Sequence, residues 1–188
     1  TQAAGFYNTL IQSDDPALVI ESLNGYRLKE RVPNNLSEFK LALGEPEILR
    51  SGSDVTVVTY GSTCRVVMEA ANQLSEAGIE AEVIDAQTLI PFDLPKLIEK
   101  SLQKTNRLVV VDEDVEGGAS AFIMQQILER DNGYFYLDSK PLTITGKNHR
   151  PAYGSDGDYF SKPNVETIFD GIYEMISEAK PDKLNPIY

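Results

Sequence analysis

The alternation of apolar, β-branched stretches with amphipathic stretches of helical period constrains the fold of this chain more than any other feature. The apolar stretches span residues 54–60, 80–86, 107–113 and 141–146, and the helical ones span 64–76, 94–103, 119–130 and 164–179. Strands separated by helices of this length form right-handed crossover units, in which neighbouring strands run parallel. The pattern therefore predicts an α/β fold with a mostly parallel sheet that helices cover on both faces.

A further strand is predicted ahead of this alternation. Residues 45–50 form a short strand-like segment, and the sequence SGSD at 51–54 joins it to the first parallel strand through a tight turn. Because such a hairpin reverses the direction of the chain, we expect an antiparallel strand at the edge of the sheet.

The first forty residues do not follow the alternation. They predict one helix, a turn at Asp14-Asp15-Pro16 and one strand at 17–21, which cannot form a core by themselves. We interpret them as the end of a preceding domain, followed by a polar linker that begins near residue 24 and ends at residue 43.

The charge and composition restrict the partners and the compartment. The chain has 29 acidic and 17 basic residues, and the net charge of -12 repels nucleic acid and anionic membranes. No window approaches the ~20 apolar residues of a membrane span, and the first 25 residues lack a signal-peptide pattern. With one cysteine no internal disulfide forms. We expect a bacterial cytoplasm or a mitochondrial matrix, and no secretion.

Cys64 is the one candidate nucleophile with a local rationale. It lies in the first turn of the predicted helix 64–76, where the helix dipole favours a thiolate. The only histidine, His149, is far away in the sequence, so no general base is paired with the thiol. We favour the interpretation that Cys64 is a small, partly buried side chain.

Open parallel sheets bind ligands beyond the carboxyl ends of their strands. After the first parallel strand, Gly61, Ser62 and Thr63 could hold an anion with backbone N–H groups and hydroxyls at the helix start. These residues match neither a Walker loop nor a GxGxxG pattern. We favour the alternative, in which Ser62 or Thr63 caps the helix.

The loop after the third parallel strand is acidic. It contains Asp112, Glu113, Asp114 and Glu116, and two glycines follow. Strand alternation sends Asp112 and Asp114 to one side and Glu113 to the other, so the carboxylates do not converge on one ion. We therefore expect no metal site, and place the acids at the positive end of the following helix.

The segment 146–164 is the most unusual part of the chain. It follows the last strand and combines His149 and Arg150 with three aromatic residues, which are Tyr153, Tyr159 and Phe160. A long irregular loop in a compact domain is usually functional or part of an interface. Without a partner, His149 is better interpreted as a surface residue than as a catalyst.

Five sequence motifs, in this order and spacing, carry a resemblance that covers essentially the whole chain. They are DPALVIES followed by GYRLKERVP, GEPEILRSGSDVTVVTYGS, EAEVIDAQTLIPFD, KTNRLVVVDEDVEGG and ITGKNHRPAYGSDGDYFSKPNVETI. With them the chain resembles the beta subunit, or the beta half of a fused alpha–beta chain, of the thiamine-diphosphate-dependent 2-oxoacid dehydrogenases. The branched-chain (2-oxoisovalerate) and pyruvate enzymes are the most similar of these.

The resemblance implies three parts. Residues 1–26 would be the last helix and strand of a truncated pyrimidine-binding domain, 27–43 a linker, and 44–188 a transketolase C-terminal domain. In the family this domain is a three-layer α/β/α sandwich with a five-stranded, mostly parallel sheet and one antiparallel edge strand. This description agrees with the pattern of strands and helices above.

The resemblance also implies a chemistry: oxidative decarboxylation of a 2-oxoacid, with transfer of the acyl group to the lipoyl arm of a dihydrolipoyl acyltransferase. Thiamine diphosphate and magnesium serve the full-length enzyme, but the family's cofactor-binding and catalytic residues precede Thr1. We therefore carry over no catalytic, cofactor-binding or metal-binding residue. We expect this chain by itself to be inactive and to bind no cofactor.

The partners that the resemblance implies are the enzyme's own alpha part or subunit, a second beta copy, and the basic binding domain of the acyltransferase. An acidic surface suits the last of these. Candidate interface residues, chosen by loop position and by the prominence of aromatic rings in interfaces, are Asp112, Glu113, Asp138, His149, Tyr153, Asp156 and Phe160.

Three positions depart from the family pattern, and two other hypotheses stay open. Gln87 stands where the family often has arginine, Asn148 stands where it has aspartate, and Ala152 stands where it has a second proline. The transketolase or deoxyxylulose-phosphate synthase C-terminal domain shares the fold, but sugar phosphates would favour basic loops over DEDVEGG. A free-standing α/β module that binds a nucleotide or anion at GST and GGAS is the alternative from another class.

Overall fold

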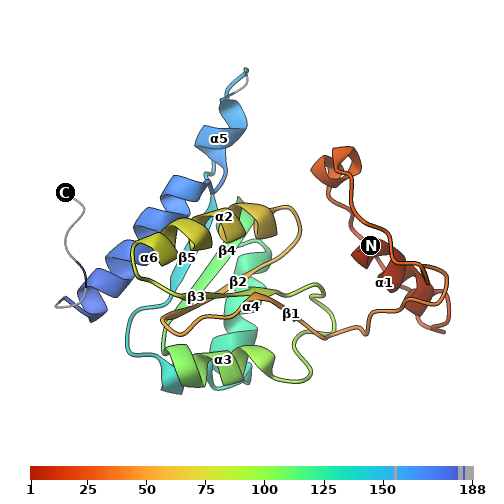
Figure 1. The fold of residues 1–188 in the computed structure, drawn as a ribbon, viewed down its shortest axis with the longest axis horizontal. Coiled ribbons are helices and arrows are strands. Elements are labelled where there is room, and N and C mark those ends of the chain that lie inside the picture. The colour runs from red at the N-terminus through yellow and green to blue at the C-terminus, as the bar shows by residue number, and fades with distance from the viewer. Residues whose placement is uncertain (155, 182–183, 185–188) are drawn as a thin grey trace.

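The computed structural model describes residues 1–154, 156–181 and 184, and Figure 1 shows its layers. The strands are β1 (Glu47–Arg50), β2 (Val55–Thr59), β3 (Ala81–Asp85), β4 (Leu108–Val115) and β5 (Leu142–Gly146). The helices are α1 (Gln2–Leu10), α2 (Thr63–Glu76), α3 (Leu97–Thr105), α4 (Ala119–Gln125), α5 (Gly157–Ser161) and α6 (Val165–Ala179). The described residues also contain three shorter helical segments: η1 (Leu23–Arg27), η2 (Gln126–Arg130), a π-turn that continues α4, and η3 (Gly133–Tyr136).

The five strands form one sheet in the order β1-β3-β2-β4-β5. The neighbours β3, β2, β4 and β5 pair in parallel, and β1 pairs antiparallel with β3 at one edge. The predicted five-stranded, mostly parallel sheet with one antiparallel edge strand is confirmed. The carboxyl ends of the four parallel strands therefore meet at one end of the sheet.

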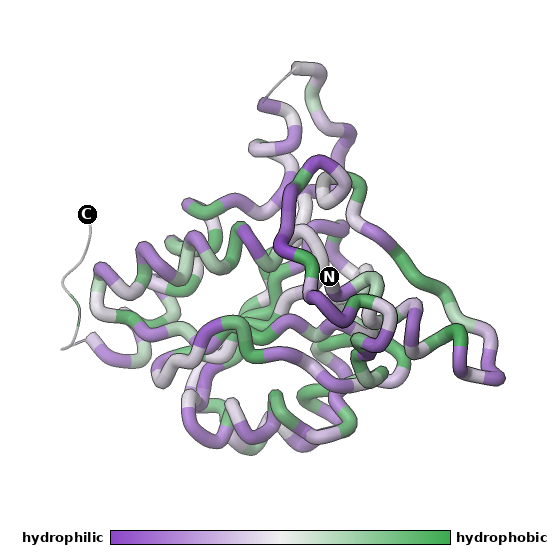
Figure 2. Tube along the Cα trace, turned by 45° about the vertical axis from the view of Figure 1, so that its right-hand side comes forward, coloured by the Kyte–Doolittle hydropathy of each residue, from purple (hydrophilic) through white to green (hydrophobic). Residues whose placement is uncertain are grey.

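Helices cover both faces of the sheet, and each face has its own apolar core. Val57 of β2 packs in the cluster under α2 and α6, whereas its neighbour Val58 packs in the cluster under α3 and α4. Residues Val109 and Val110 of β4 divide between the two clusters in the same way. Because successive side chains of these buried strands enter opposite cores, the sheet lies between two helical layers, which is the α/β/α sandwich that the sequence predicts. Figure 2 shows hydrophobic residues concentrated along the central strands.

The predicted hairpin between β1 and β2 is wrong, although the edge position and direction of β1 are confirmed. Between β1 and β2 the chain instead crosses the amino-terminal end of β3. The N–H groups of Ser53 and Asp54 both donate to the carbonyl of Glu80, the residue before β3, at 2.9 Å. The turn at 51–54 therefore reaches across β3, and β1 pairs with the far side of that strand.

The predicted strand at 17–21 is also wrong for this structure. In the described part of the chain these residues have no regular secondary structure and pair with no strand, and Leu18 and Ile20 are 86% and 84% exposed. A strand needs a neighbour to satisfy its backbone groups. The predicted helix before it is confirmed as α1, which the Asn8 side chain ties to the following chain by donating to the carbonyls of Leu36 and Phe39.

The segment between β5 and α6 stands apart from the layers. In both views it extends away from the sheet and carries the short helix α5 (Figures 1 and 2). Its two ends are held together where the Lys147 N–H donates to the Ser161 carbonyl at 2.8 Å. We call residues 147–154 and 156–162 the arm.

Among the helices of the described residues, none combines the length and the apolar character that a membrane span requires.

Candidate functional site

The acidic loop begins with a buried carboxylate at the carboxyl end of β4. Asp112 is fully buried and accepts hydrogen bonds from the Tyr60 hydroxyl at 2.7 Å, from Asp114 N–H at 3.0 Å and from Ser120 N–H at 2.8 Å. Burial, and then the bond to Asp112, raises the pKa of Tyr60 far above its ordinary value. Asp112 therefore caps α4, as predicted, and has no surface to offer a partner.

The neighbouring Glu113 points to the other side of β4, as strand alternation predicts. Its carboxylate accepts from the Ser62 hydroxyl at 3.0 Å and lies 3.6 Å from Lys162 Nζ. The side chain remains 45% exposed. Glu113 thus links the end of β4 to the start of α2 and to the arm, and still presents negative charge to solvent.

The favoured interpretation, in which the hydroxyl of Ser62 or Thr63 caps the helix, is wrong. Neither hydroxyl caps α2: Ser62 donates to Glu113, and the Thr63 hydroxyl is buried without a hydrogen-bond partner in the described part of the chain. The anion site at Gly61, Ser62 and Thr63 stays a prediction. A carboxylate 3.0 Å from the Ser62 oxygen opposes a second negative charge there.

The arm brings aromatic rings and cations together. Tyr153 is 86% exposed, and the Arg150 guanidinium lies 4.9 Å from its ring centroid. Phe160 is 62% exposed, and Lys147 Nζ lies 3.7 Å from its ring centroid. His149 is exposed beside Phe160, with ring centroids 6.1 Å apart. The structure thus gathers these three predicted interface residues on one protruding segment.

Asp156, also predicted as an interface residue, starts α5 in the same arm and is exposed. Asp138 is different, because it lies just before β5 and therefore at the opposite end of the sheet. It pairs at 2.5 Å with Arg107, a side chain that is only 5% exposed and also donates to the Asp54 carbonyl. One small partner cannot contact Asp138 and the arm together.

Residues outside the predicted set complete this end of the sheet. Tyr60, Lys147 and Lys162 supply the partners of Asp112, Phe160 and Glu113. Tyr60 directly follows β2, the strand next to β4, so the strand order would have indicated this contact. No sequence pattern near Lys147 or Lys162 indicates these contacts. They form only because the two ends of the arm lie close together and next to the end of β4.

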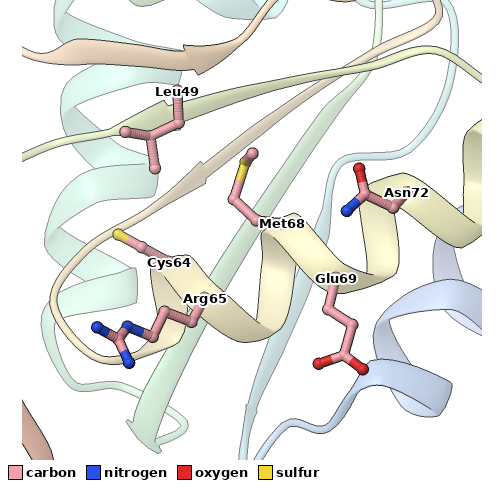
Figure 3. A pocket seen from close by; sticks show the side chains of 6 residues that line it. All are labelled: Leu49, Cys64, Arg65, Met68, Glu69 and Asn72. Atoms are coloured by element: carbon pink, nitrogen blue, oxygen red, sulfur yellow. The ribbon is translucent and has the colours of Figure 1, made fainter. Parts of the chain in front are cut away.

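Cys64 lines a shallow, open depression of about 360 Å³ between α2 and β1. Figure 3 shows Cys64 and Met68 on the side of α2 that faces Leu49, with Arg65 and Glu69 directed away. Burial raises the pKa of the Cys64 thiol far above its ordinary range, and the Asp85 carboxylate adds to the shift. The raised pKa and the partial burial of Cys64 agree with the interpretation that it is a structural side chain and not a nucleophile.

We expect Cys64 to react slowly with iodoacetamide near neutral pH, because a raised pKa leaves little of the reactive thiolate. The rate should keep rising with pH well above the ~8.5 of an ordinary thiol. Mass spectrometry of the alkylated chain, with glutathione as the reference, gives the rate. A reaction that reaches its plateau near the pH of the glutathione plateau would contradict this prediction.

The described residues do not fit a thiamine diphosphate and magnesium site. They contain no group of three or more His, Cys, Asp or Glu side chains that could hold a metal ion. At Ser62, the helix start considered above as an anion site, the Glu113 carboxylate accepts a hydrogen bond from the Ser62 hydroxyl at 3.0 Å and would repel a diphosphate. We therefore assign no step of thiamine chemistry to these residues.

The parallel sheet, its antiparallel edge strand and the two helical layers define an α/β/α domain of the transketolase C-terminal type. The family described as "Transketolase, C-terminal domain" matches residues 44–166. The chain belongs to this family.

Curated relatives of the chain include beta subunits of two kinds of enzyme. The chain is 38% identical over 146 residues to the pyruvate dehydrogenase E1 component subunit beta of Chlorokybus atmophyticus, covering 78% of this chain and 42% of that protein. It is 38% identical over 149 residues to the acetoin:2,6-dichlorophenolindophenol oxidoreductase subunit beta of Bacillus subtilis, covering 79% and 42%. The chain thus spans less than half the length of these relatives.

A solved structure supports the same fold. The inactive beta4 tetramer of a split-gene transketolase superposes with a TM-score of 0.60 at 22% identity, over 75% of this chain and 44% of that one. A likeness at this level of identity concerns the fold alone.

Proposed function

We propose that this chain is the C-terminal assembly and acyltransferase-docking part of a thiamine-diphosphate-dependent 2-oxoacid dehydrogenase. The observation that supports this proposal most directly is the similarity of the chain to pyruvate dehydrogenase E1 beta subunits. The similarity covers most of the chain, and 93% of it for the Mesostigma viride protein. In this proposal thiamine diphosphate and magnesium bind outside the described residues. The substrate is a 2-oxoacid such as pyruvate or 2-oxoisovalerate, and this chain alone is inactive.

The proposed partners follow from the same similarity. They are an alpha part or subunit, a second beta copy, and the basic binding domain of a dihydrolipoyl acyltransferase, in a bacterial cytoplasm or mitochondrial matrix. Glu113 supports the docking role, because its carboxylate stays 45% exposed at the end of the sheet. Complementary charge speeds encounter and fixes the register of such a complex.

We expect the acyltransferase binding domain to bind this chain and to bind more weakly as salt rises, because salt screens exposed charges. Calorimetric titration at low and high salt measures this. Replacing Glu113 with lysine should weaken binding at low salt about tenfold, because it turns an attraction into a repulsion.

The matched control for this titration is Glu178→Lys. Glu178 is exposed near the end of α6, at the opposite end of the sheet, and its replacement changes the net charge by the same amount. Equal weakening by both variants would contradict a local docking surface. The absence of any salt-sensitive complex would contradict the docking role itself, and tight binding of phosphate or ATP instead would favour the anion-binding module.

A further inference from the structure

We propose that Gln2, Glu47 and Asp85 form a proton-sensitive latch, which holds α1 against the edge of the sheet at low pH and releases it as the pH rises. The inference goes beyond the proposed function, because it concerns how residues 1–43 attach to the sheet domain. It requires neither the docking of an acyltransferase nor the binding of any other chain.

Two carboxylates lie side by side in this latch. Glu47 of β1 and Asp85 of β3 are direct partners in the antiparallel pair, so their side chains leave the sheet on the same face. Asp85 is 6% exposed, whereas Glu47 is open to solvent. Like charges directly opposite each other on two strands are destabilising, and burial strengthens the repulsion because the dielectric constant is low there.

No lysine or arginine in the described part of the chain pairs with either carboxylate. The cations on the neighbouring elements, which are Arg65 of α2 and the amine of Thr1, lie 3.7 and 3.3 Å from Glu30 instead. The start of α2 adds only the partial positive charge of a helix end. Burial, with Glu47 as a smaller cause, raises the pKa of Asp85 above its ordinary value.

Gln2 supplies a neutral link between these carboxylates and α1. Its side-chain amide donates to Glu47 Oε2 at 2.8 Å and also forms a hydrogen bond with Asp85. The donors on the sheet domain are uncharged as well: Gln87 donates to both carboxylates, at 2.9 and 3.0 Å, and the Cys64 thiol bonds Asp85. Figure 1 shows α1 beside the layers of the domain and not within them, so this bridge contributes to holding it there.

The sign of the pH dependence follows from the water that the closed latch displaces. The Gln2 amide has two N–H bonds to share between two carboxylates, fewer than the water that would replace it. The repulsion is therefore stronger while α1 is docked, and Asp85 binds a proton more tightly in the closed state than in the open one. This contribution to closure is complete below the ordinary pKa of an aspartate and is lost as the pH rises through the raised pKa of Asp85.

An NMR titration of the whole chain tests the inference, because it observes the Asp85 carboxyl carbon and the orientation of α1 separately. We expect the Asp85 signal to shift with a midpoint above that of an ordinary aspartate. Residual dipolar couplings of α1 and α2 should fit one common alignment below this midpoint and two different alignments above it. An α1 that keeps one alignment with α2 at every pH, or that docks only at high pH, would overturn the inference.

Two variants separate the proton from the bridge. Asp85→Asn carries no charge at any pH and keeps an oxygen for the Gln87 N–H, so α1 should stay docked throughout the titration. Gln2→Ala changes an exposed side chain and removes the bridge, so α1 should be undocked at every pH while Asp85 still titrates. Loss of the common alignment with rising pH in Asp85→Asn would show that another group controls α1, and would also overturn the inference.

Glu47→Gln and Glu45→Gln form the matched pair of variants. Each removes one negative charge, but Glu45 is exposed ahead of β1, whereas Glu47 lies opposite Asp85. The midpoint of Asp85 should therefore fall in Glu47→Gln and stay within the error of the titration in Glu45→Gln. Equal shifts in the two variants would mean that the net charge, and not the facing carboxylates, sets the midpoint, which contradicts the latch.

Discussion

Replacing Asp112 with alanine should lower the free energy of unfolding by about 3 kcal/mol, because one buried donor and two partly buried donors lose their acceptor, and a buried donor left unsatisfied costs about 1–3 kcal/mol. The donors are the Tyr60 hydroxyl and the backbone N–H groups of Asp114 and Ser120. Asp112 itself is fully buried, so water cannot replace its oxygens without opening the structure. Urea unfolding followed by circular dichroism measures the change.

Two related variants separate the contributions of the individual bonds. Asp112→Asn keeps an oxygen for Tyr60 and Asp114 but turns an amide NH2 toward Ser120 N–H, so its loss should be intermediate. Tyr60→Phe removes a single bond and should cost about 1 kcal/mol. If Asp112→Ala cost no more than Tyr60→Phe, the carboxylate would not be the acceptor that holds this strand end and α4 together.

Replacing Gly52 with alanine should destabilise the domain by about 3 kcal/mol, the upper part of the usual range for overpacking. A Cβ at this position would lie 2.2 Å from the Ala81 carbonyl carbon and 2.3 Å from Glu82 N. Both are backbone atoms of β3, so neither can rotate aside. The turn that carries the chain across β3 would have to move. Thermal and urea unfolding both report this loss.

Gly25→Ala is the control for Gly52→Ala. A Cβ at Gly25 would meet only Ser22 Cβ, at 3.9 Å, and the backbone there has no left-handed φ. This replacement should change stability by less than about 0.5 kcal/mol. Similar losses in both variants would show that the crossing of β3 is looser than the structure indicates.

Local pattern was enough to predict much of the fold. The apolar run that becomes β4 and the amphipathic run that becomes α2 were placed within two residues, because period and burial are properties of neighbours in the chain. Asp112 as a cap of α4 was predictable for the same reason, since only eight residues separate it from Ser120. Its bond to Tyr60 was not, because it requires β2 to lie next to β4.

The sequence by itself determined the kinds of elements, the two apolar faces of each central strand, and the sides to which Asp112 and Glu113 point. Only the tertiary structure decided that β1 pairs with β3, that residues 17–21 lack a neighbouring strand, and that Asp138 lies far from the arm. The physical reason is the range of the interactions. Helix and strand periods arise within a few residues, whereas these contacts join distant parts of the chain, and strand order brings them together only after the sheet has formed.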